Sequence, residues 1–526
     1  MKTKRKTVIS IIISFVIVFL ISLIFLPASP LHSIGNTWND TNAMLTVGQA
    51  WKNGIVPYKE IFEQRGPIMF FYYLLANLVS SQGYLGLFII EIANLFFLYF
   101  ISFKFLKLIK KSLILNAFLA SFLPLAFIAS AGFEEGGSPE EFAAPWVLLG
   151  IYLIFKAYKK NYLNWKTISF LIGICASLVF WIKYSIVGSL FFCAIYLLYL
   201  FIKTKRYKLI WQGLVFSLIG FAIISLIIII YFASQHAFHD LLFTYFTVNS
   251  KYYAPKSLFL KWLLRVFSLN GLVLFNLLYW ILGISSLIFI KKRINSFLTF
   301  LFIWADIGIA SFIFYAGSLF AYGNLILETL LLMPMMLFLQ NKLASSHWNL
   351  NKTKTLSASF GLIFLLSLFL IPRGNVAINS WKDEAIPKLA KTIKNHSGHK
   401  PVSILTANSI DPGIGRFIPL KFGNKYFEKT NIDNQNYPQE LNGIKKETRE
   451  QTPDYIIWAK WGYPYIQKTG LGKEPKIIKF DKRYKNDIFK YYKPIKNVKY
   501  KGLISIPSSI YPVTDNSNNY ILLKRR

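Results

Sequence analysis

Long apolar runs separated by short basic clusters occupy the first 371 residues of the chain. Several of these runs reach the ~20 apolar residues that a helix needs to cross a bilayer. The pattern predicts about eleven membrane-spanning helices, at 8–26, 84–103, 113–131, 142–158, 167–182, 185–202, 209–233, 272–290, 297–315, 320–339 and 355–371. Basic residues precede the first run, as in a signal peptide. That run is long for a signal segment and no small-residue cleavage site follows it, so we interpret it as a retained span.

The basic clusters indicate how the spans are oriented. Cytoplasmic loops of membrane proteins carry an excess of Lys and Arg. Here the clusters occur in every second loop, at 104–111, 159–166, 203–208, 291–293 and 342–354. We therefore place these loops and the N-terminus in the cytoplasm. The alternate loops are poorer in cations or longer, and they are predicted to lie outside the cell membrane, at 27–83, 132–141 and 234–271.

One further apolar segment, 67–82, needs a separate decision. Counting it as a span would place the cluster at 104–111 outside and would invert every later loop. The segment is rich in Phe, Tyr and Leu and carries no charge. We interpret it as a helix that lies on the outer membrane surface or re-enters it.

The chain becomes polar from about Pro372, and no further span is predicted there. Residues 402–407 and 455–458 have the composition of buried strands, and 380–395 has that of a helix. About 150 residues are enough for one small domain. The predicted fold class is therefore an all-α polytopic membrane domain at 1–371, followed by a small extracellular α/β domain at 372–526.

Composition agrees with a membrane protein. Hydrophobic residues make up 54% of the chain and 48 residues are Phe, which is more apolar surface than a soluble globular protein can hide. In a soluble protein, the net charge of +35 would suggest nucleic-acid binding. Here the charge lies between apolar runs, where cytoplasmic loops and anionic lipid head groups account for it, so no nucleic-acid partner is predicted. The only cysteines, Cys175 and Cys193, fall within predicted spans and indicate no disulfide framework. Abundant Lys, Asn and Ile suggest an AT-rich bacterial genome.

The first external loop contains three charged residues suited to chemistry at a lipid head group. Asp40 follows the first span, and Glu63 and Arg65 precede the surface helix. A carboxylate can deprotonate an incoming hydroxyl, and a planar guanidinium binds phosphate through two parallel hydrogen bonds. A structural alternative stays open, in which Asp40 caps a helix that begins near Thr41.

The second external loop is strongly acidic. Its carboxylates are Glu134, Glu135, Glu140 and Glu141. Such a cluster is repulsive unless it binds cations, hydroxyls or basic side chains. Glu140 and Glu141 lie at the mouth of a span, so we favour them as functional residues. The alternative is a solvated acidic loop that balances nearby lysines.

The third external region offers metal ligands and phosphate contacts. His236 and His239 could supply two ligands from one helical face, but no third ligand is marked by spacing. Lys251 and Arg265 are candidate phosphate contacts. The alternative for both cations is that they extend toward the membrane surface from apolar surroundings.

These loop motifs resemble those of one family. An acid after span one, the step G-x-x-P-Y at 54–58 and E-x-R-G-P at 63–67 resemble the bacterial branch of the GT-C glycosyltransferases. That branch includes the dolichyl-phosphate-mannose protein mannosyltransferase-like (family 39-type) and lipid A aminoarabinose transferase-like membrane enzymes. The second loop reads G-G-x-x-E-E-F-x-x-P at 136–145 and is similar to a segment of the same branch. The tail, with its strand at 453–457, resembles the family less specifically.

The resemblance implies roles for individual residues. Asp40 would be the catalytic base, and Glu63 and Arg65 would help to hold the donor phosphate, with Arg65 where the family often has Lys. Tyr58, in the G-x-x-P-Y step, would belong to the substrate-binding residues. Some relatives bind a divalent ion through a His of the third region and the Glu of the first loop. Glu63, His236 and His239 are therefore the metal candidates, and no cofactor is assigned.

The predicted function is an inverting transfer of a sugar from a polyprenyl-phosphate donor to an extracellular acceptor, which would be an envelope glycopolymer such as a teichoic acid, a lipid or a protein. Asp40 would deprotonate the acceptor hydroxyl, and Arg65 with Lys251 or Arg265 would neutralise the phosphate. One alternative is a flippase or transporter of lipid-linked saccharides, for which Asp306 and Glu328 inside spans would be the relevant acids. Another is a non-catalytic subunit of envelope assembly.

Overall fold

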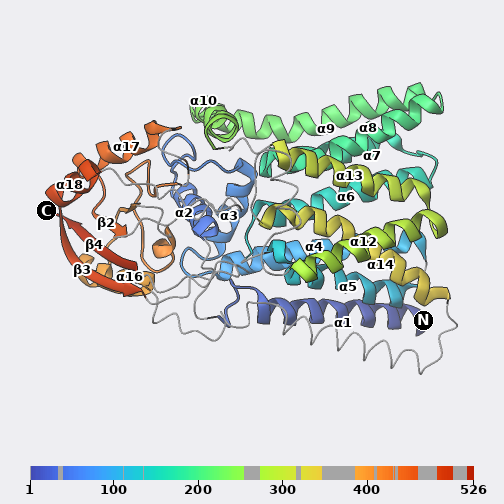
Figure 1. Cartoon of the computed structure of the whole chain (residues 1–526), viewed down its shortest axis with the longest axis horizontal. Coiled ribbons are helices and arrows are strands. Elements are labelled where there is room, and N and C mark those ends of the chain that lie inside the picture. The colour runs from blue at the N-terminus through green and yellow to red at the C-terminus, as the bar shows by residue number, and fades with distance from the viewer. Residues whose placement is uncertain are drawn as a thin grey trace.

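The computed structural model describes residues 2–32, 39–110, 112–133, 136–253, 273–315, 321–345, 385–407, 412–430, 432, 436–459, 482–500 and 518–526. Long helices form a bundle, and a sheet with its own helices forms the C-terminal region, which we define as residues 385–526. Figure 1 shows the N-terminus at the end of the bundle that lies away from this region. Two short helices, α2 (Asn39–Lys52) and α3 (Pro67–Val79), lie between the bundle and the C-terminal region (Figure 1).

The bundle is built from the apolar runs. Its helices are α1 (Lys2–Phe25), α4 (Leu85–Ile109), α5 (Leu113–Ala129), α6 (Pro139–Lys159), α7 (Trp165–Ile182), α8 (Gly188–Lys203), α9 (Tyr207–Ser234), α12 (Val273–Arg293), α13 (Ser296–Tyr315) and α14 (Leu325–Ser345). Helices thus occupy the predicted spans from 8–26 to 320–339, and the predicted span at 355–371 lies outside the described residues.

Length and composition fit a multi-pass membrane protein. Within the described residues, six helical segments are long and apolar enough to cross a bilayer, at Leu85–Ile109, Pro139–Lys159, Trp165–Ile182, Tyr184–Lys203, Tyr207–Ser234 and Leu325–Leu343. Helix α9 carries large exposed apolar side chains along its length, including Trp211, Ile227 and Ile230. In water such a surface would be unfavourable, whereas in lipid it faces hydrocarbon.

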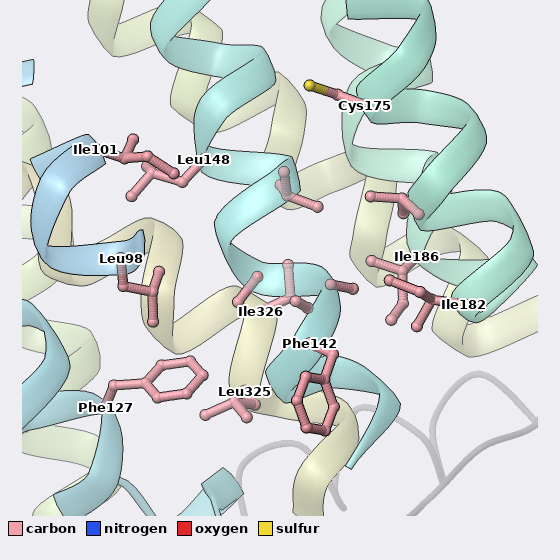
Figure 2. Packing of buried hydrophobic residues seen from close by; sticks show 14 of the residues in the cluster. Leu98, Ile101, Phe127, Phe142, Leu148, Cys175, Ile182, Ile186, Leu325 and Ile326 are labelled. Atoms are coloured by element: carbon pink, nitrogen blue, oxygen red, sulfur yellow. The ribbon is translucent and has the colours of Figure 1, made fainter. Parts of the chain in front are cut away.

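The centre of the bundle is closely packed. Figure 2 shows Leu98 of α4, Phe127 of α5, Leu148 of α6, Ile182 of α7 and Leu325 of α14 within one cluster. All five side chains are buried. This packing fixes the ends of the helices and therefore the loops that the ends carry.

Helices α2 (Asn39–Lys52) and α3 (Pro67–Val79) pack closely against each other. A Cβ added to Gly48 would lie 2.5 Å from the backbone carbon of Tyr73, so only glycine allows this approach. Asn77 of α3 donates a hydrogen bond to the carbonyl of Leu45 at 2.9 Å. With 13 residues, α3 is about 20 Å long, which is shorter than the ~30 Å hydrocarbon core. The length favours the interpretation of this segment as a surface helix.

The C-terminal region contains a four-stranded sheet of order β1-β2-β4-β3. Its elements are α16 (Ala385–Ser397), β1 (Ile404–Ala407), η7 (Pro412–Arg416), α17 (Pro438–Arg449), β2 (Tyr455–Ala459), α18 (Lys482–Tyr491), β3 (Tyr492–Tyr500) and β4 (Asn518–Arg525). Strands β1 and β2 are parallel, and β4 is antiparallel to both β2 and β3.

Alternate residues of the strands face two apolar clusters, as the pleat requires. Ile404 and Ile457 lie in one cluster, and Leu405 and Ile456 lie in the other. The strands predicted at 402–407 and 455–458 correspond to β1 and β2, and the helix predicted at 380–395 overlaps α16. The external location of this region stays a prediction.

Arg416 connects the C-terminal region to helices α2 and α3. Its side chain is buried and donates hydrogen bonds to the Asn77 side chain at 3.0 Å and to the Gln49 side chain at 2.5 Å. Its carbonyl accepts a hydrogen bond from Gly83 N at 2.9 Å. Burial lowers the pKa of Arg416 to about 10, so the side chain is still a cation at neutral pH.

Replacing Arg416 by methionine is expected to destabilise the protein by about 2 kcal/mol or more, because Gln49 and Asn77 would lose their buried donor. Thermal unfolding of the detergent-purified full chain measures the effect. Arg449→Met is the matched control, since Arg449 is 57% exposed and pairs with Asp487 at the surface. Such surface pairs contribute about 0–1 kcal/mol. Equal unfolding temperatures for the two variants would contradict the role given to Arg416.

Candidate functional site

Three charged residues of the first loop form a contiguous cluster. The Arg65 guanidinium contacts Asp40 (Nη2 to Oδ2, 2.5 Å) and Glu63 (Nη1 to Oε1, 2.6 Å). Glu63 is buried, whereas the side chains of Arg65 and Asp40 are 17% and 26% exposed. The buried Glu63 carboxylate therefore holds the Arg65 guanidinium from inside the protein. The Asp40 side chain is the most exposed of the three.

Asp40 lies in the first turn of α2, which begins at Asn39. A carboxylate is favourable there because the N-terminal end of a helix carries partial positive charge. The described contact of this carboxylate is nevertheless the ion pair with Arg65. The alternative of a simple helix cap leaves that ion pair without an explanation.

The local backbone holds Arg65 in place from several sides. Tyr58 has a positive φ of 69° and its buried hydroxyl donates to the Arg65 carbonyl at 2.7 Å. Asn249 donates to the Gln64 carbonyl at 2.7 Å. A Cβ added to Gly66 would lie 2.1 Å from the carbonyl oxygen of Trp181, so this step packs directly on the end of α7. The next residue, Pro67, starts α3. Each named residue of the E-x-R-G-P motif thus has a structural role. Glu63 pairs with Arg65, Gly66 allows the close approach to α7, and Pro67 starts α3.

The second loop folds over the start of α2. Thr41 donates to the Gly136 carbonyl at 3.0 Å, and Tyr73 donates to the Gly137 carbonyl at 2.6 Å. Glu141 accepts a hydrogen bond from Gly137 N at 2.6 Å, while its own amide donates to the Ser138 hydroxyl at 3.0 Å. The hydrogen bond from Glu141 N to the Ser138 hydroxyl caps the N-terminus of α6. Glu141 therefore shapes the loop, and Glu134 and Glu135 lie outside the described residues.

Glu140 has a different partner. Its buried carboxylate accepts a hydrogen bond from Lys183 Nζ at 2.6 Å, and the Lys183 side chain is 26% exposed. Lys183 directly follows α7, whose end contacts Gly66. Two acid–base groups, Asp40–Arg65–Glu63 and Glu140–Lys183, are consequently brought to the same end of the bundle.

The C-terminal region also reaches this site. Phe62 N donates to the Lys425 carbonyl at 2.8 Å. The rings of Phe62 and Tyr437 stack with centroids 5.9 Å apart. Glu428 follows Lys425 by three residues, and its carboxyl interacts electrostatically with Glu63, Arg65 and Asp40. Burial, and then the Glu63, Asp40 and Glu440 carboxylates, raise the pKa of Glu428 well above its ordinary value, although Arg65 opposes the shift.

The described part of the third region places its candidate side chains beside aromatic rings. The ring of His239 stacks on Phe243, and the Lys251 ammonium lies 5.4 Å from the centre of the Tyr252 ring. His236 sits at a positive φ of 52° in the turn after α9. Arg265 lies outside the described residues. In the part of the chain that is described, no group of three His, Cys, Asp or Glu side chains is arranged to hold a metal ion.

The two acids predicted inside spans have separate surroundings. Glu328 of α14 accepts a hydrogen bond from Gly132 N at 3.3 Å, so it joins this helix to the second loop. Asp306 of α13 is partly exposed, but its Oδ1 atom is buried and has no hydrogen-bond partner among the described residues. The two acids therefore do not belong to one described polar network.

The sequence patterns did not point to Lys183 or Glu428 as residues of the site. Lys183 stood between two predicted spans on the side where cations are rare, and that position was a usable signal. Glu428 carried no comparable signal, because its place depends on how the C-terminal region docks. Asp40, Glu63, Arg65 and Tyr58 lie together as their motifs suggested.

No protein-family model and no curated protein sequence matches the chain. Among solved structures, the fold is similar to ArnT from Cupriavidus metallidurans bound to undecaprenyl phosphate, with a TM-score of 0.54 and 9% identity over 98% of this chain and 97% of that chain. It is also similar to ArnT from the same organism in the apo state, with a TM-score of 0.50 and 11% identity over 86% of this chain and 92% of that chain.

ArnT is a GT-C aminoarabinose transferase. The chain therefore has a GT-C-like fold over nearly its whole length, and the family resemblance predicted from the loop motifs is confirmed for the fold.

Proposed function

We propose that this chain is a membrane glycosyltransferase that moves a sugar from a polyprenyl-phosphate donor to an acceptor outside the cytoplasm. The observation that carries the proposal is the Arg65 guanidinium held between Asp40 and Glu63, in a partly exposed site at the end of a GT-C-like bundle. The acceptor is an envelope glycopolymer, with teichoic acids included, a lipid or a protein.

Asp40 acts as the general base in this proposal. Its carboxylate takes the proton from the acceptor hydroxyl while the hydroxyl oxygen attacks the anomeric carbon. The bond between that carbon and the phosphate oxygen breaks, and its electron pair leaves with the polyprenyl phosphate. Attack from the face opposite the leaving group inverts the anomeric configuration. The 26% exposure of the Asp40 side chain is what an incoming acceptor requires.

Arg65 stabilises the negative charge that develops on the leaving phosphate. A guanidinium is suited to this task because it is planar and always charged. Glu63 Oε1 accepts a hydrogen bond from Arg65 Nη1 at 2.6 Å and another from Gln64 N at 2.8 Å. The second bond fixes the Glu63 carboxylate, which in turn orients the guanidinium. Tyr58 helps to position Arg65 by donating a hydrogen bond to the Arg65 backbone carbonyl. We assign Lys251 and Arg265 as further cations for the phosphate.

The remaining substrate-binding residues come from the second loop. Glu140, buried and paired with Lys183, is assigned to the acceptor side together with Glu141, which shapes the loop. Phe71 and Leu78 are exposed apolar side chains of α3, the helix that begins two residues after Arg65, and they offer a surface for the prenyl chain. The solved ArnT structure contains undecaprenyl phosphate, and this supports a polyprenyl-phosphate partner for the present chain.

The choice of donor tests the proposal. The purified protein is offered labelled hexoses on undecaprenyl phosphate, or the corresponding nucleotide sugars, together with a crude envelope acceptor. We expect label on the acceptor only with the polyprenyl-phosphate donors. Transfer from nucleotide sugars, or none from any polyprenyl-phosphate hexose, would contradict the proposal.

A further inference from the structure

The segment that carries Glu428 is fixed against the first loop. The carbonyl of Lys425 accepts the hydrogen bond from Phe62 N at 2.8 Å, one residue before Glu63. The amide of Lys425 donates to Glu447 of α17 at 2.7 Å. The loop that bears Arg65 and the C-terminal region therefore share a backbone contact beside the site.

The backbone around Glu428 is held equally firmly by β1. Thr406 N donates to the Phe427 carbonyl at 2.8 Å, and Lys429 N donates to the Thr406 carbonyl at 3.1 Å. Phe427 packs into the apolar core of the bundle. Glu428 thus lies between two anchored neighbours at the junction of the two parts of the protein.

The adjacent cation does not neutralise Glu428. Lys429 is buried and pairs with Glu440 at 2.6 Å, and it donates two further hydrogen bonds to carbonyl oxygens, those of Thr430 and Ile432. Glu428 itself is only 9% exposed, and the described residues offer its carboxyl neither a hydrogen bond nor a salt bridge.

The charges that face Glu428 favour its protonated form. They come from Asp40, Glu63 and Arg65 on the first loop and from Glu440 on α17. The one cation among them, Arg65, already contacts two carboxylates. A third buried negative charge beside them would be unfavourable, and burial itself acts in the same direction. A protonated carboxyl has an O–H group to donate.

We propose that Glu428 is a substrate-contacting residue that the C-terminal region adds to the site, where its carboxyl group forms a hydrogen bond with the bound donor. The inference rests on the proposed glycosyl transfer and extends it. It makes the C-terminal region a part of the donor site.

Two substitutions separate this role from a structural one. Glu428→Ala removes the donor, and we expect kcat/KM for the lipid-linked sugar to fall ~10-fold, which corresponds to the loss of one hydrogen bond. Glu428→Gln is also neutral and keeps an N–H donor, so we expect it to stay within about threefold of wild type. Glu450→Gln is the matched control, because Glu450 is exposed and pairs only with Lys446 at 3.8 Å in the described structure.

The pH profile provides a second readout. The pKa of Glu428 is raised, so the neutral form is present below that raised pKa and is lost as the pH rises through it. The wild-type rate should therefore fall on the alkaline side, and Glu428→Gln should lack this fall. Unfolding temperatures of all variants are measured in parallel to identify a variant that fails to fold.

Inhibition by undecaprenyl phosphate, which has no sugar, identifies the oxygen that is bound. If Glu428 contacts the phosphate, Glu428→Ala weakens this inhibition. If it contacts a sugar hydroxyl, inhibition is unchanged while KM for the sugar donor rises.

Wild-type kinetics in a folded Glu428→Ala variant would overturn this inference and leave the proposed function standing. So would a Glu428→Gln variant that loses as much kcat/KM as Glu428→Ala and still loses rate at alkaline pH as the wild type does. A wild-type protein that transfers no sugar would overturn the proposed function and this inference with it.

Discussion

Replacing Asp40 by asparagine is expected to lower the rate of sugar transfer by about 10²- to 10⁴-fold, which is the usual contribution of a positioned general base. Asparagine has nearly the same shape and still offers an oxygen to Arg65, which Glu63 continues to hold. It cannot accept the proton of the acceptor hydroxyl. The measurement is the initial rate of label transfer from undecaprenyl-phosphate hexose, with wild type and variant purified in the same detergent.

The control for Asp40→Asn is the folded state of the variant. The side chains of the Asp40–Arg65 pair are both partly exposed, so the loss of one charge should alter stability by about 1 kcal/mol or less. An inactive variant that unfolds at the wild-type temperature supports the role of Asp40 in the chemical step. Wild-type turnover in a folded Asp40→Asn variant would refute the assignment of the base.

Replacing Gly66 by alanine is expected to destabilise the protein by about 3 kcal/mol and to lower transfer by about 100-fold. The new Cβ would lie 2.1 Å from the Trp181 carbonyl oxygen and 2.4 Å from that of Ile182, and both atoms belong to the backbone of α7. The chain must move there, and Arg65 moves with it. Displacements of ~1 Å in a reacting group have effects of this size.

Gly423→Ala is the matched control for Gly66→Ala. No heavy atom lies within 4 Å of a Cβ added to Gly423, and its φ is outside the left-handed region. We expect unfolding temperature and transfer rate to match wild type. If Gly66→Ala behaves like this control, the close packing of the E-x-R-G-P step on α7 does not position Arg65.

Much of the bundle could be predicted from the sequence because the signal is strong. Apolar runs of sufficient length must become helices in lipid, where each backbone group needs a partner within the segment. The basic loops led us to leave 67–82 out of the spans. Helix α3 at this place has 13 residues, and the topology itself stays a prediction. The motifs marked Asp40 and Arg65 as candidates but did not predict their ion pair, because the fold of α2 and of the loop after it brings the two residues together.

The C-terminal region was harder to predict. Strands β1 and β2 have compact apolar runs, whereas β3 reads YKPIKNVKY and contains a register shift between Pro494 and Lys496. The shift breaks the alternation that marks a strand. Glu428 could not be assigned to the site, because its position follows from the docking that Arg416, Phe62 and Lys425 fix in three dimensions.

The most direct test of the central claim follows a labelled sugar in proteoliposomes that contain only the purified chain. Undecaprenyl-phosphate hexose with a labelled sugar is incorporated in the bilayer, and an envelope acceptor is supplied on one side. We expect label to move from the lipid to the acceptor, with inverted anomeric configuration. Label that crosses the bilayer still attached to its lipid, with none on any acceptor, would contradict a transferase and identify a flippase.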